Sequence, residues 1–428
     1  MKVYRYPSSD SWSELLKRPV MERASLEELV QGILNEVKAN GDAAIKAYAL
    51  KFDGTELKSL LASKEEIKEA QDLVDDKLKG AIDTAFKNIK RFHIAQKEGE
   101  IKVETMQGVT CWRKSLPIEK VGLYIPGGTA PLFSTILMLG VPATIAGCKE
   151  IVLCTPPNKQ GKIHPAILYT ADILGIKTIV KAGGAQAIAA MAIGTESVPK
   201  VYKIFGPGNQ YVTTAKQMVT QLGVAIDMPA GPSEVAVVAD ETANPDFVAA
   251  DLLSQAEHGI DSQVVLITDS DSFITKVQNS IEEQLAQLPR KELAAKALEH
   301  SKTFLVKDLL DDGMRMMNAY APEHLILQVK QTMPFVERVV NAGSVFIGAY
   351  TPESAGDYAS GTNHTLPTNG YATAYAGVSL DSFVRKVTFQ EITADGLKNI
   401  GPVIETMAAA ESLDAHKNAV SIRLKTID

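Results

Sequence analysis

From residue 121 onward the sequence alternates short apolar runs with helix-like segments, and this alternation constrains the fold more than any other feature. The runs VGLYIPGG, EIVLCTPP, TIVKAGG and KIFGPG each end in glycine or proline and precede a helical pattern. Repeated strand–helix units are typical of a parallel sheet covered by helices. The glycines and prolines predict loops at the carboxyl edge of the sheet, where α/β proteins usually bind ligands.

A second series of strand-like runs follows, as EVAVVAD, QVVLITDS, TFLVKD, HLILQ and SVFIG. A chain of 428 residues also exceeds the size at which one hydrophobic core stops growing. We therefore expect two or more domains of the α/β class. The segment 23–110 differs because it is mostly helical and charged, and the segment from 381 onward consists of short helices that could hardly bury a core alone.

Charge and cysteine content exclude several classes of protein. The net charge of −7 and the lack of a Lys/Arg stripe argue against nucleic acid or an anionic membrane as a partner. The first residues contain no apolar core of the signal-peptide kind. Three cysteines, Cys111, Cys148 and Cys154, are too few and oddly numbered for a disulfide framework. We therefore expect a cytoplasmic protein.

The uncharged stretch 130–147 approaches the shortest length of a membrane span. Pro131, Gly140 and Pro142 interrupt it, however, and charged segments follow at once. We expect a buried pair of helices and no membrane partner.

The first of two Glu-His pairs, Glu257-His258, ends a predicted helix that begins with Asn244-Pro245. Gln255 and His258 are three residues apart, so they share a face in the last helical turn. The partial negative charge at a helix carboxyl end suits a cation. Gln255 and His258 are therefore candidate metal ligands. The alternative is a solvated helix end, with His258 hydrogen-bonded to a nearby acceptor.

The second pair, Glu323-His324, follows a proline and immediately precedes the strand-like run HLILQ. We expect the proline to restrict the backbone of Ala321. A buried polar pair at the mouth of a strand is costly unless it is hydrogen-bonded or functional. Both a structural and a catalytic role for His324 fit this position.

A glycine-rich loop at 352–372 contains Asp357, a candidate oxygen ligand, and His364, a candidate substrate contact. A glycine-stiffened turn capped by Asp357 explains it equally well. Near the carboxyl end, Glu411 and His416 are a weaker signal, because residues five apart do not share a helix face unless a turn intervenes. One mixed N/O set suits zinc or a similar divalent ion. Its members are Gln255, His258, Asp357 and His416.

The dinucleotide fingerprint G-x-G-x-x-G is absent, since neither GLYIPGGTAP nor FGPGNQYV has its spacing. The glycine-rich strand ends at 127–128, 183–184 and 206–208 allow a phosphate to approach the backbone. They are equally compatible with ordinary tight turns. By motif alone, NAD binding is unsupported.

Several longer blocks resemble the histidinol dehydrogenase family, in the expected order and over nearly the whole chain. They are GLYIPGGTAPLFSTILMLGVPATIAGC, GGAQAIAA, KIFGPGNQYV, IDMPAGPSEV, DLLSQAEHG, PEHLIL, SAGDYASGTNHTLPT and LDAHKNAV. The resemblance implies oxidation of L-histidinol through L-histidinal to L-histidine, the last steps of histidine biosynthesis. It also implies two NAD per substrate molecule and one zinc ion per subunit.

The resemblance further implies a role for each matching residue. His324 would be the general base and Glu323 would activate water. The metal ligands would be Gln255, His258, Asp357 and His416. The substrate would contact Ser233, Gln255, His258, His324, Asp357, Glu411 and His416, and NAD would contact Tyr124, Gln186 and Asn209. The family is a homodimer with shared active sites, so Glu411 and His416 would come from the partner subunit.

The fold expected from these features is α/β, with two incomplete Rossmann-like domains similar to those of aldehyde dehydrogenases and small helical N- and C-terminal segments. Residues 1–22 would form an N-terminal arm, and 23–123 plus 235–380 a larger discontinuous domain. Residues 124–234 would form an inserted domain that contributes to NAD binding, and 381–428 a helical tail that packs on the partner subunit. The remaining alternatives are a related zinc- and NAD-dependent dehydrogenase of another small alcohol, and a zinc hydrolase that uses Glu323.

Overall fold

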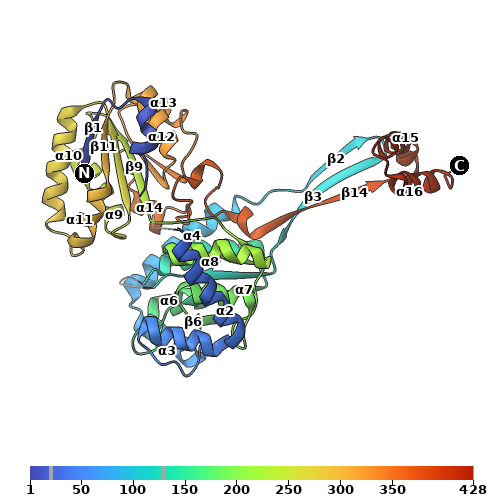
Figure 1. Ribbon diagram of the computed structural model, residues 1–428, viewed down its shortest axis with the longest axis horizontal. Helices are drawn as coiled ribbons and strands as arrows, with labels where there is room; N and C mark the ends of the chain where they lie inside the picture. The colour runs from blue at the N-terminus through green and yellow to red at the C-terminus, as the bar shows by residue number, and fades with distance from the viewer. Residues whose placement is uncertain (19–22, 128–130, 428) are drawn as a thin grey trace.

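The computed structural model describes residues 1–18, 23–127 and 131–427. It has two α/β lobes and a long arm that projects away from them (Figure 1). Each lobe is built on its own parallel sheet, and an antiparallel sheet forms the arm. The expected α/β class, with two Rossmann-like domains and small terminal helical segments, is confirmed.

The larger sheet has six parallel strands in the order β1-β11-β10-β9-β12-β13. The strands are β1 (Lys2–Arg5), β9 (Glu234–Ala239), β10 (Gln263–Thr268), β11 (Lys302–Leu305), β12 (His324–Gln328) and β13 (Ser344–Ile347). Strands β9, β10 and β12 are buried along their whole length, so their sequences are nearly continuous runs of branched apolar residues. The helices of this lobe are α1 (Trp12–Leu15), α9 (Pro245–Ala256), α10 (Asp271–Leu285), α11 (Lys291–His300), α12 (Met314–Tyr320), α13 (Thr332–Val336) and α14 (Glu353–Tyr358).

The smaller sheet has five parallel strands in the order β6-β5-β4-β7-β8. The strands are β4 (Lys120–Tyr124), β5 (Glu150–Thr155), β6 (Thr178–Lys181), β7 (Lys203–Phe205) and β8 (Ala225–Ile226). The accompanying helices are α5 (Phe133–Ala146), α6 (Pro165–Ile173), α7 (Gly184–Ile193) and α8 (Gln210–Val219). In each sheet the strand order reverses beside one central strand, β4 or β9, as in doubly wound folds.

Three N-terminal helices cover the smaller lobe, which differs from the expected grouping of residues 23–123 with 235–380. They are α2 (Arg23–Tyr48), α3 (Lys64–Leu73) and α4 (Asp76–Ile94). Helix α2 packs on α7 and α8, α3 packs on α6, and α4 packs on α5. An amphipathic helix carries an apolar stripe but no strand register, so its sequence does not indicate which sheet it covers.

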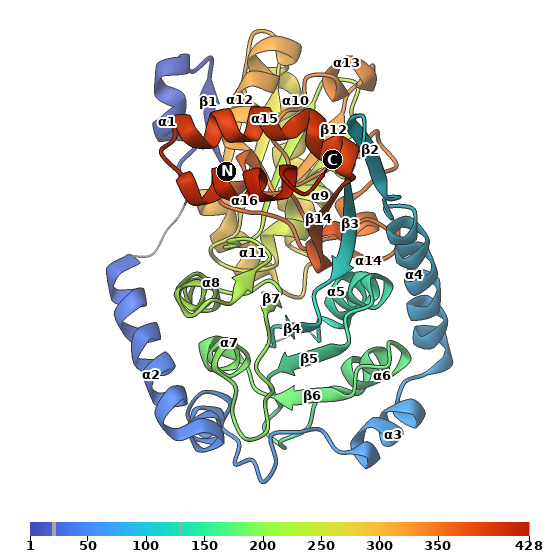
Figure 2. The same ribbon diagram turned by 90° about the vertical axis from the view of Figure 1, so that its right-hand side faces the viewer.

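The arm is an antiparallel sheet of β2 (Ile101–Met106), β3 (Val109–Pro117) and β14 (Val384–Ile392). At its far end α15 (Ala394–Ala410) and α16 (Asp414–Leu424) lie side by side (Figure 2). The expected helical tail is therefore present, but a strand precedes it. The three strands were not expected, because they are exposed or half-buried nearly throughout and no buried face imposes an alternation of apolar residues.

The uncharged stretch forms one buried helix, α5, instead of the expected pair, and Ala130 lies outside the described residues. Pro142 lies inside α5, and the helix packs against α4 and α6. Among the described residues, no helix combines the length and the apolar character that crossing a membrane requires.

Candidate active site

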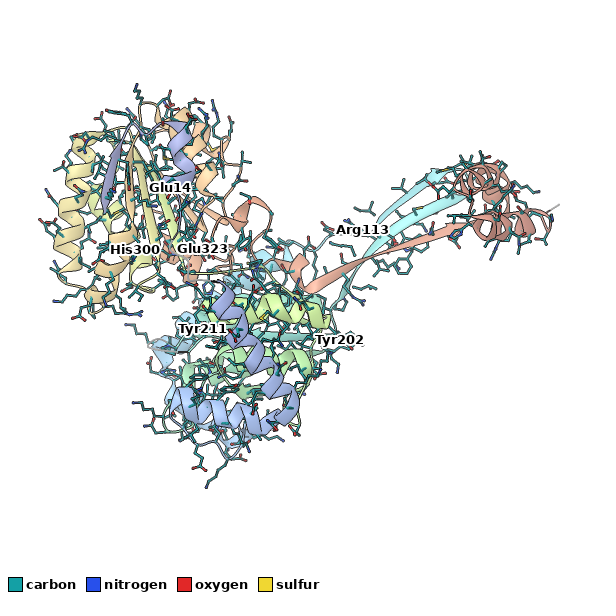
Figure 3. All side chains as sticks on the ribbon, viewed as in Figure 1. Glu14, Arg113, Tyr202, Tyr211, His300 and Glu323 are labelled. Carbon is teal, nitrogen blue, oxygen red and sulfur yellow. The ribbon has the colours of Figure 1, made fainter. Side chains whose placement is uncertain are left out.

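Glu323 and His324 lie at the amino end of β12, in the middle of the larger sheet. His324 is the first residue of the strand and pairs with Val235 of β9 and Ser344 of β13. Both side chains are buried. Figure 3 shows Glu323 where the larger lobe faces the smaller one. This site therefore uses the amino edge of the sheet, whereas ligands of α/β folds usually bind at the carboxyl edge.

Ala321 has a left-handed backbone, with φ 50° and ψ 66°, where α12 ends. The residue before a proline usually adopts an extended conformation, which was the expectation here. A left-handed non-glycine residue is strained by about 1–3 kcal/mol and persists where its surroundings fix it. The strain lies two residues before the Glu323-His324 pair.

The backbone of Glu234, the first residue of β9, holds the pair in place. Its N–H donates to Glu323 Oε2 at 2.9 Å, and its carbonyl oxygen lies 3.1 Å from His324 Nδ1. The same carbonyl accepts a 3.2 Å hydrogen bond from Gln255 Nε2. With Nδ1 donating to the carbonyl, His324 Nε2 is left for another partner.

Helix α14 brings Asp357 and Glu353 to the other side of His324. Asp357 Oδ1 is 3.6 Å from His324 Nε2, and Glu353 Oε1 is 3.9 Å from Nδ1. One donor atom from each of His324, Glu353 and Asp357 lies within 4.8 Å of the others, so the group could hold a metal ion. Glu353 was not expected from the sequence. The signal for it was its position four residues before Asp357, on the same helical face.

Three buried polar atoms at this site find no hydrogen-bond partner among the described residues. They are Gln255 Oε1, His324 Nε2 and Glu353 Oε2. An unsatisfied buried polar atom is costly, so it indicates a ligand that completes its bonding. An amide oxygen, an imidazole nitrogen and a carboxylate oxygen are donors that a divalent cation accepts.

Burial and mutual charge shift the titration of this cluster. Burial raises the pKa of Glu323 to about 8. Burial opposes a charge on His324, but the carboxylates of Glu353, Glu323 and Asp357 outweigh it and raise the pKa of His324 well above its ordinary value. Burial likewise opposes the charge on Asp357, yet the imidazole of His324, 3.6 Å away through Nε2, lowers the pKa of Asp357. Strongly shifted groups of this kind are typical of functional sites.

The other predicted histidines differ in their surroundings. His258, just after α9, keeps an exposed surface. Burial of its ring lowers the pKa of His258, which also interacts electrostatically with Asp357 and His324. His364 lies 2.8 Å from the Asp357 carbonyl oxygen through Nδ1 and 3.0 Å from Thr135 Oγ1 through Nε2. Both its ring nitrogens are thus used within the protein, which favours a structural role over the expected substrate contact.

Glu411 and His416 are exposed and belong to the helical tip of the arm, which projects away from the two lobes in Figure 1. The expected turn between them is present, because α15 ends at Ala410 and α16 begins at Asp414. Within one chain these two residues do not join the cluster around His324. Ser233 precedes Glu234 and therefore lies beside it.

A cavity of about 1060 Å³ lies at the carboxyl ends of β4, β5 and β6. Tyr124, Gln186 and Asn209 all line it, together with Gly183 and Gly184 at the start of α7. Its size is at the upper end of the range of about 300–1000 Å³ for small-molecule sites. The structure thus brings together the three residues expected to contact NAD.

Local contacts fix the walls of this cavity. The Gly184 N–H donates to Tyr124 Oη at 3.1 Å, and burial raises the pKa of Tyr124 to about 12. Gly206 has φ 131°, and a Cβ there would lie 2.1 Å from the Tyr124 carbonyl oxygen, so only glycine fits. Asn209 accepts the Val212 N–H at 3.1 Å and caps α8.

Comparison with known proteins decides the family. The family model described as histidinol dehydrogenase matches residues 16–424. The chain belongs to the histidinol dehydrogenase family. Membership identifies it as an NAD-dependent oxidoreductase of the final steps of histidine biosynthesis, as the resemblance of its sequence blocks implied.

Relatives in several organisms support the assignment to histidinol dehydrogenases. The chain is 64% identical over 427 residues to "Histidinol dehydrogenase" of Bacteroides thetaiotaomicron, with 100% of both chains covered. It is 53% identical over 433 residues to "Histidinol dehydrogenase, chloroplastic" of Arabidopsis thaliana, covering 100% of this chain and 92% of that one.

Solved structures agree with this family and with the expected fold. A crystal structure of histidinol dehydrogenase from Elizabethkingia anophelis superimposes with a TM-score of 0.97 at 55% identity, covering 100% of this chain and 98% of that one. An acetylating aldehyde dehydrogenase from Geobacillus thermoglucosidasius has a TM-score of 0.51 at 14% identity, over 89% of this chain and 93% of that one. The second similarity shows the fold alone.

Proposed function

We propose that this histidinol dehydrogenase oxidises L-histidinol through L-histidinal to L-histidine at the cluster around His324. In this proposal His324 is the general base, Glu323 activates water, and the partner subunit supplies Glu411 and His416. The observation that carries it is the attachment of both catalytic side chains to the backbone of one residue, Glu234, with His324 Nε2 unbonded and facing Asp357.

In the first oxidation His324 removes the proton of the alcohol as hydride leaves the same carbon. A base must lie within hydrogen-bond reach of the proton and keep its ring nitrogen free. The hydrogen bond from Nδ1 to the Glu234 carbonyl oxygen fixes the ring, which leaves Nε2 of the neutral imidazole for this task. NAD supplies the hydride acceptor.

In the second oxidation Glu323 removes a proton from the water that attacks the aldehyde. The resulting hydrate has a C–OH group, so His324 can again take a proton while a second hydride leaves. Burial raises the pKa of Glu323 to about 8, and a base is most effective when its pKa lies near the working pH. The Glu234 N–H keeps the carboxylate aimed at the site.

The donor set fits a zinc ion. Gln255, His258, Asp357 and the partner's His416 would hold it, since Gln255 Oε1 is buried without a protein partner and Asp357 is held ionised. Zinc would position the substrate and stabilise negative charge on its oxygen. The alternative group of His324, Glu353 and Asp357 is less suitable, because it would occupy the nitrogen that the alcohol proton requires.

The cavity beside β4 is the proposed NAD site. Tyr124, Gln186 and Asn209 line it, and the start of α7 presents backbone N–H groups that suit a pyrophosphate. Helix α5 links the cavity to the catalytic cluster. Pro131 lines the cavity, and Thr135 contacts His364, whose Nδ1 lies against the Asp357 carbonyl.

The form of the arm supports a shared active site. Its helices α15 and α16 leave large apolar side chains exposed, among them Val403, Met407 and Ile422. An exposed apolar surface on an element that cannot bury a core alone favours docking on another molecule. A second copy of the chain would cover this surface and receive Glu411 and His416.

The decisive assay follows absorbance at 340 nm with histidinol and NAD. We expect two NADH per histidinol and loss of the signal after treatment with a chelator. Oxidation of a different small alcohol, with histidinol inert, would indicate a related dehydrogenase. Zinc-dependent hydrolysis without NADH would contradict the proposal.

A further inference from the structure

Arg18, at the end of the N-terminal arm, is bound to the residue that holds the catalytic pair. Its Nε donates to Glu234 Oε1 at 2.5 Å and its Nη2 to Glu234 Oε2 at 2.9 Å. The two side chains are 13% and 4% exposed. A buried two-point pair of this kind fixes orientation as well as charge.

Further contacts fix Arg18 itself. Its Nη2 donates to the Tyr320 carbonyl oxygen at 2.6 Å, and its guanidinium lies 4.0 Å from the centre of the Tyr320 ring. The Asn369 N–H donates to Glu234 Oε1 at 2.8 Å, which adds the 352–372 loop to the same carboxylate. Arg18 thus connects the N-terminal arm, the end of α12 and the start of β9.

We propose that Arg18 is a positioning residue for catalysis, acting through Glu234 on Glu323 and His324. The side chain of Glu234 is clamped by Arg18, while its N–H binds Glu323 and its carbonyl oxygen binds His324 and Gln255. A displacement of the Glu234 backbone would move both catalytic groups at once. The inference rests on the roles proposed above for Glu323 and His324.

A simple structural role would predict a different outcome. If Arg18 only held the N-terminal segment in place, its loss would lower stability and the fraction of folded enzyme but leave each folded site unchanged. If it positions Glu234, each folded site becomes slower and the pH dependence of the rate changes. A displacement of about 1 Å can cost on the order of 100-fold in rate.

The test compares Arg18→Met and Arg18→Lys with a control variant that loosens the same N-terminal segment. Lys302 Nζ donates to the Leu15 and Lys17 carbonyl oxygens, so Lys302→Met loosens the N-terminal segment without removing a contact of Glu234. Single-turnover rates of histidinol and histidinal oxidation are measured per folded, zinc-loaded subunit, with the KM for NAD and the pH–rate profile. Arg18→Lys keeps the charge but loses the two-point geometry. If Arg18→Met does not fold, the rates and pH–rate profile of Arg18→Lys decide the test.

We expect both Arg18 variants to slow both oxidations, Arg18→Met by about 10- to 100-fold, and to shift the pH–rate profile, with the KM for NAD unchanged. Lys302→Met should lower stability only. Unchanged rates and profile in Arg18→Lys, or the same kinetic change in Lys302→Met, would overturn the proposal. Glu323→Gln and His324→Gln run in parallel: if they retain full activity, the assigned catalytic roles fail, which is a separate result from that of Arg18.

Discussion

The carboxylate of Glu323 accepts a 2.9 Å hydrogen bond from the backbone N–H of Glu234, whose carbonyl oxygen lies 3.1 Å from His324 Nδ1. The backbone of one residue, Glu234, therefore sets the spacing between the proposed base and the proposed water-activating group. Each side chain has its own anchor on that residue, Glu323 on the N–H and His324 on the carbonyl oxygen.

Replacement of Glu323 by glutamine should separate the two oxidations. Glutamine retains an oxygen for the Glu234 N–H but cannot take a proton from water. We expect the first oxidation to persist and the second to fall by about 10²–10⁴-fold, the usual contribution of a general base. NADH counted in a single turnover should approach one per histidinol. Two NADH at the wild-type rate would contradict the assigned role.

Gln255→Leu should weaken metal binding, because it removes the buried Oε1 that lacks a protein partner. Metal content after dialysis should fall, by about 10-fold in affinity or more if Oε1 is a ligand. A ligand or its supporting group is typically worth about 10- to 100-fold in affinity. Glu257→Gln, two residues away on the other face of the helix end, is the matched control and should keep the metal. Equal metal content in both variants would exclude Gln255 as a ligand.

Tyr124→Phe tests the NAD cavity. The change removes the hydroxyl that accepts the Gly184 N–H and leaves the ring in place. A lost hydrogen bond of about 1 kcal/mol corresponds to roughly a 5-fold weaker affinity. The KM for NAD should rise with little change in kcat. Tyr202→Phe, at an exposed position outside the cavity lining, should leave the KM unaltered.

Asp251→Asn should change how stability depends on pH. Burial raises the pKa of Asp251 from 3.8 to about 6, so the folded protein holds this proton more tightly than the unfolded chain. Its stabilising contribution is present below about pH 4 and is lost as the pH rises through about 6, a difference of roughly 3 kcal/mol. Asparagine does not ionise, so the variant does not lose this stability as the pH rises.

Urea unfolding of wild type and Asp251→Asn at pH 4.5 and pH 7.5 measures the effect. The variant should gain stability relative to wild type at the higher pH. Asp10→Asn, at an exposed position, is the control and should run parallel to wild type. A constant difference between wild type and Asp251→Asn across this range would show that Asp251 does not ionise with the raised pKa.

Mixed dimers test whether the tail completes the partner's site. A subunit carrying His324→Gln combined with one carrying His416→Gln would contain one site with both defects and one with neither. About half of the wild-type activity per dimer should therefore return, although each variant alone is inactive. This figure follows from the symmetry of a two-fold dimer. Wholly inactive heterodimers would show that each chain supplies its own His416.

Much of the fold followed from sequence because buried parallel strands leave a strong apolar signal. The runs at β4–β7 and β9–β13 were recognisable for this reason. Helices α2–α4 could be recognised as helices but not assigned to a lobe. Strand β2 could not be recognised at all, since every one of its residues is exposed.

The site was predictable where the chemistry is carried by ionisable side chains in a distinctive order. Glu323, His324, Gln255 and Asp357 do meet in the structure. Glu234 was missed because its contribution is mainly through its backbone, which any residue type provides. Contacts between Arg18 and Glu234 span 216 positions, and no local pattern encodes them.

The pairing of β3 with β14 continues without interruption over nine residues of each strand. Each residue of an antiparallel strand adds about 3.4 Å and points its side chain to the opposite face. The number of residues in the strands of the arm therefore sets the distance of the tip from the lobes. A matched insertion of two residues in both strands would keep the faces and carry the tip about 7 Å further. An insertion of a single residue in each strand would turn the helical tip to the opposite face of the sheet. If His416 completes a partner's site, the length of β3 and β14 matters for activity as much as the histidine itself.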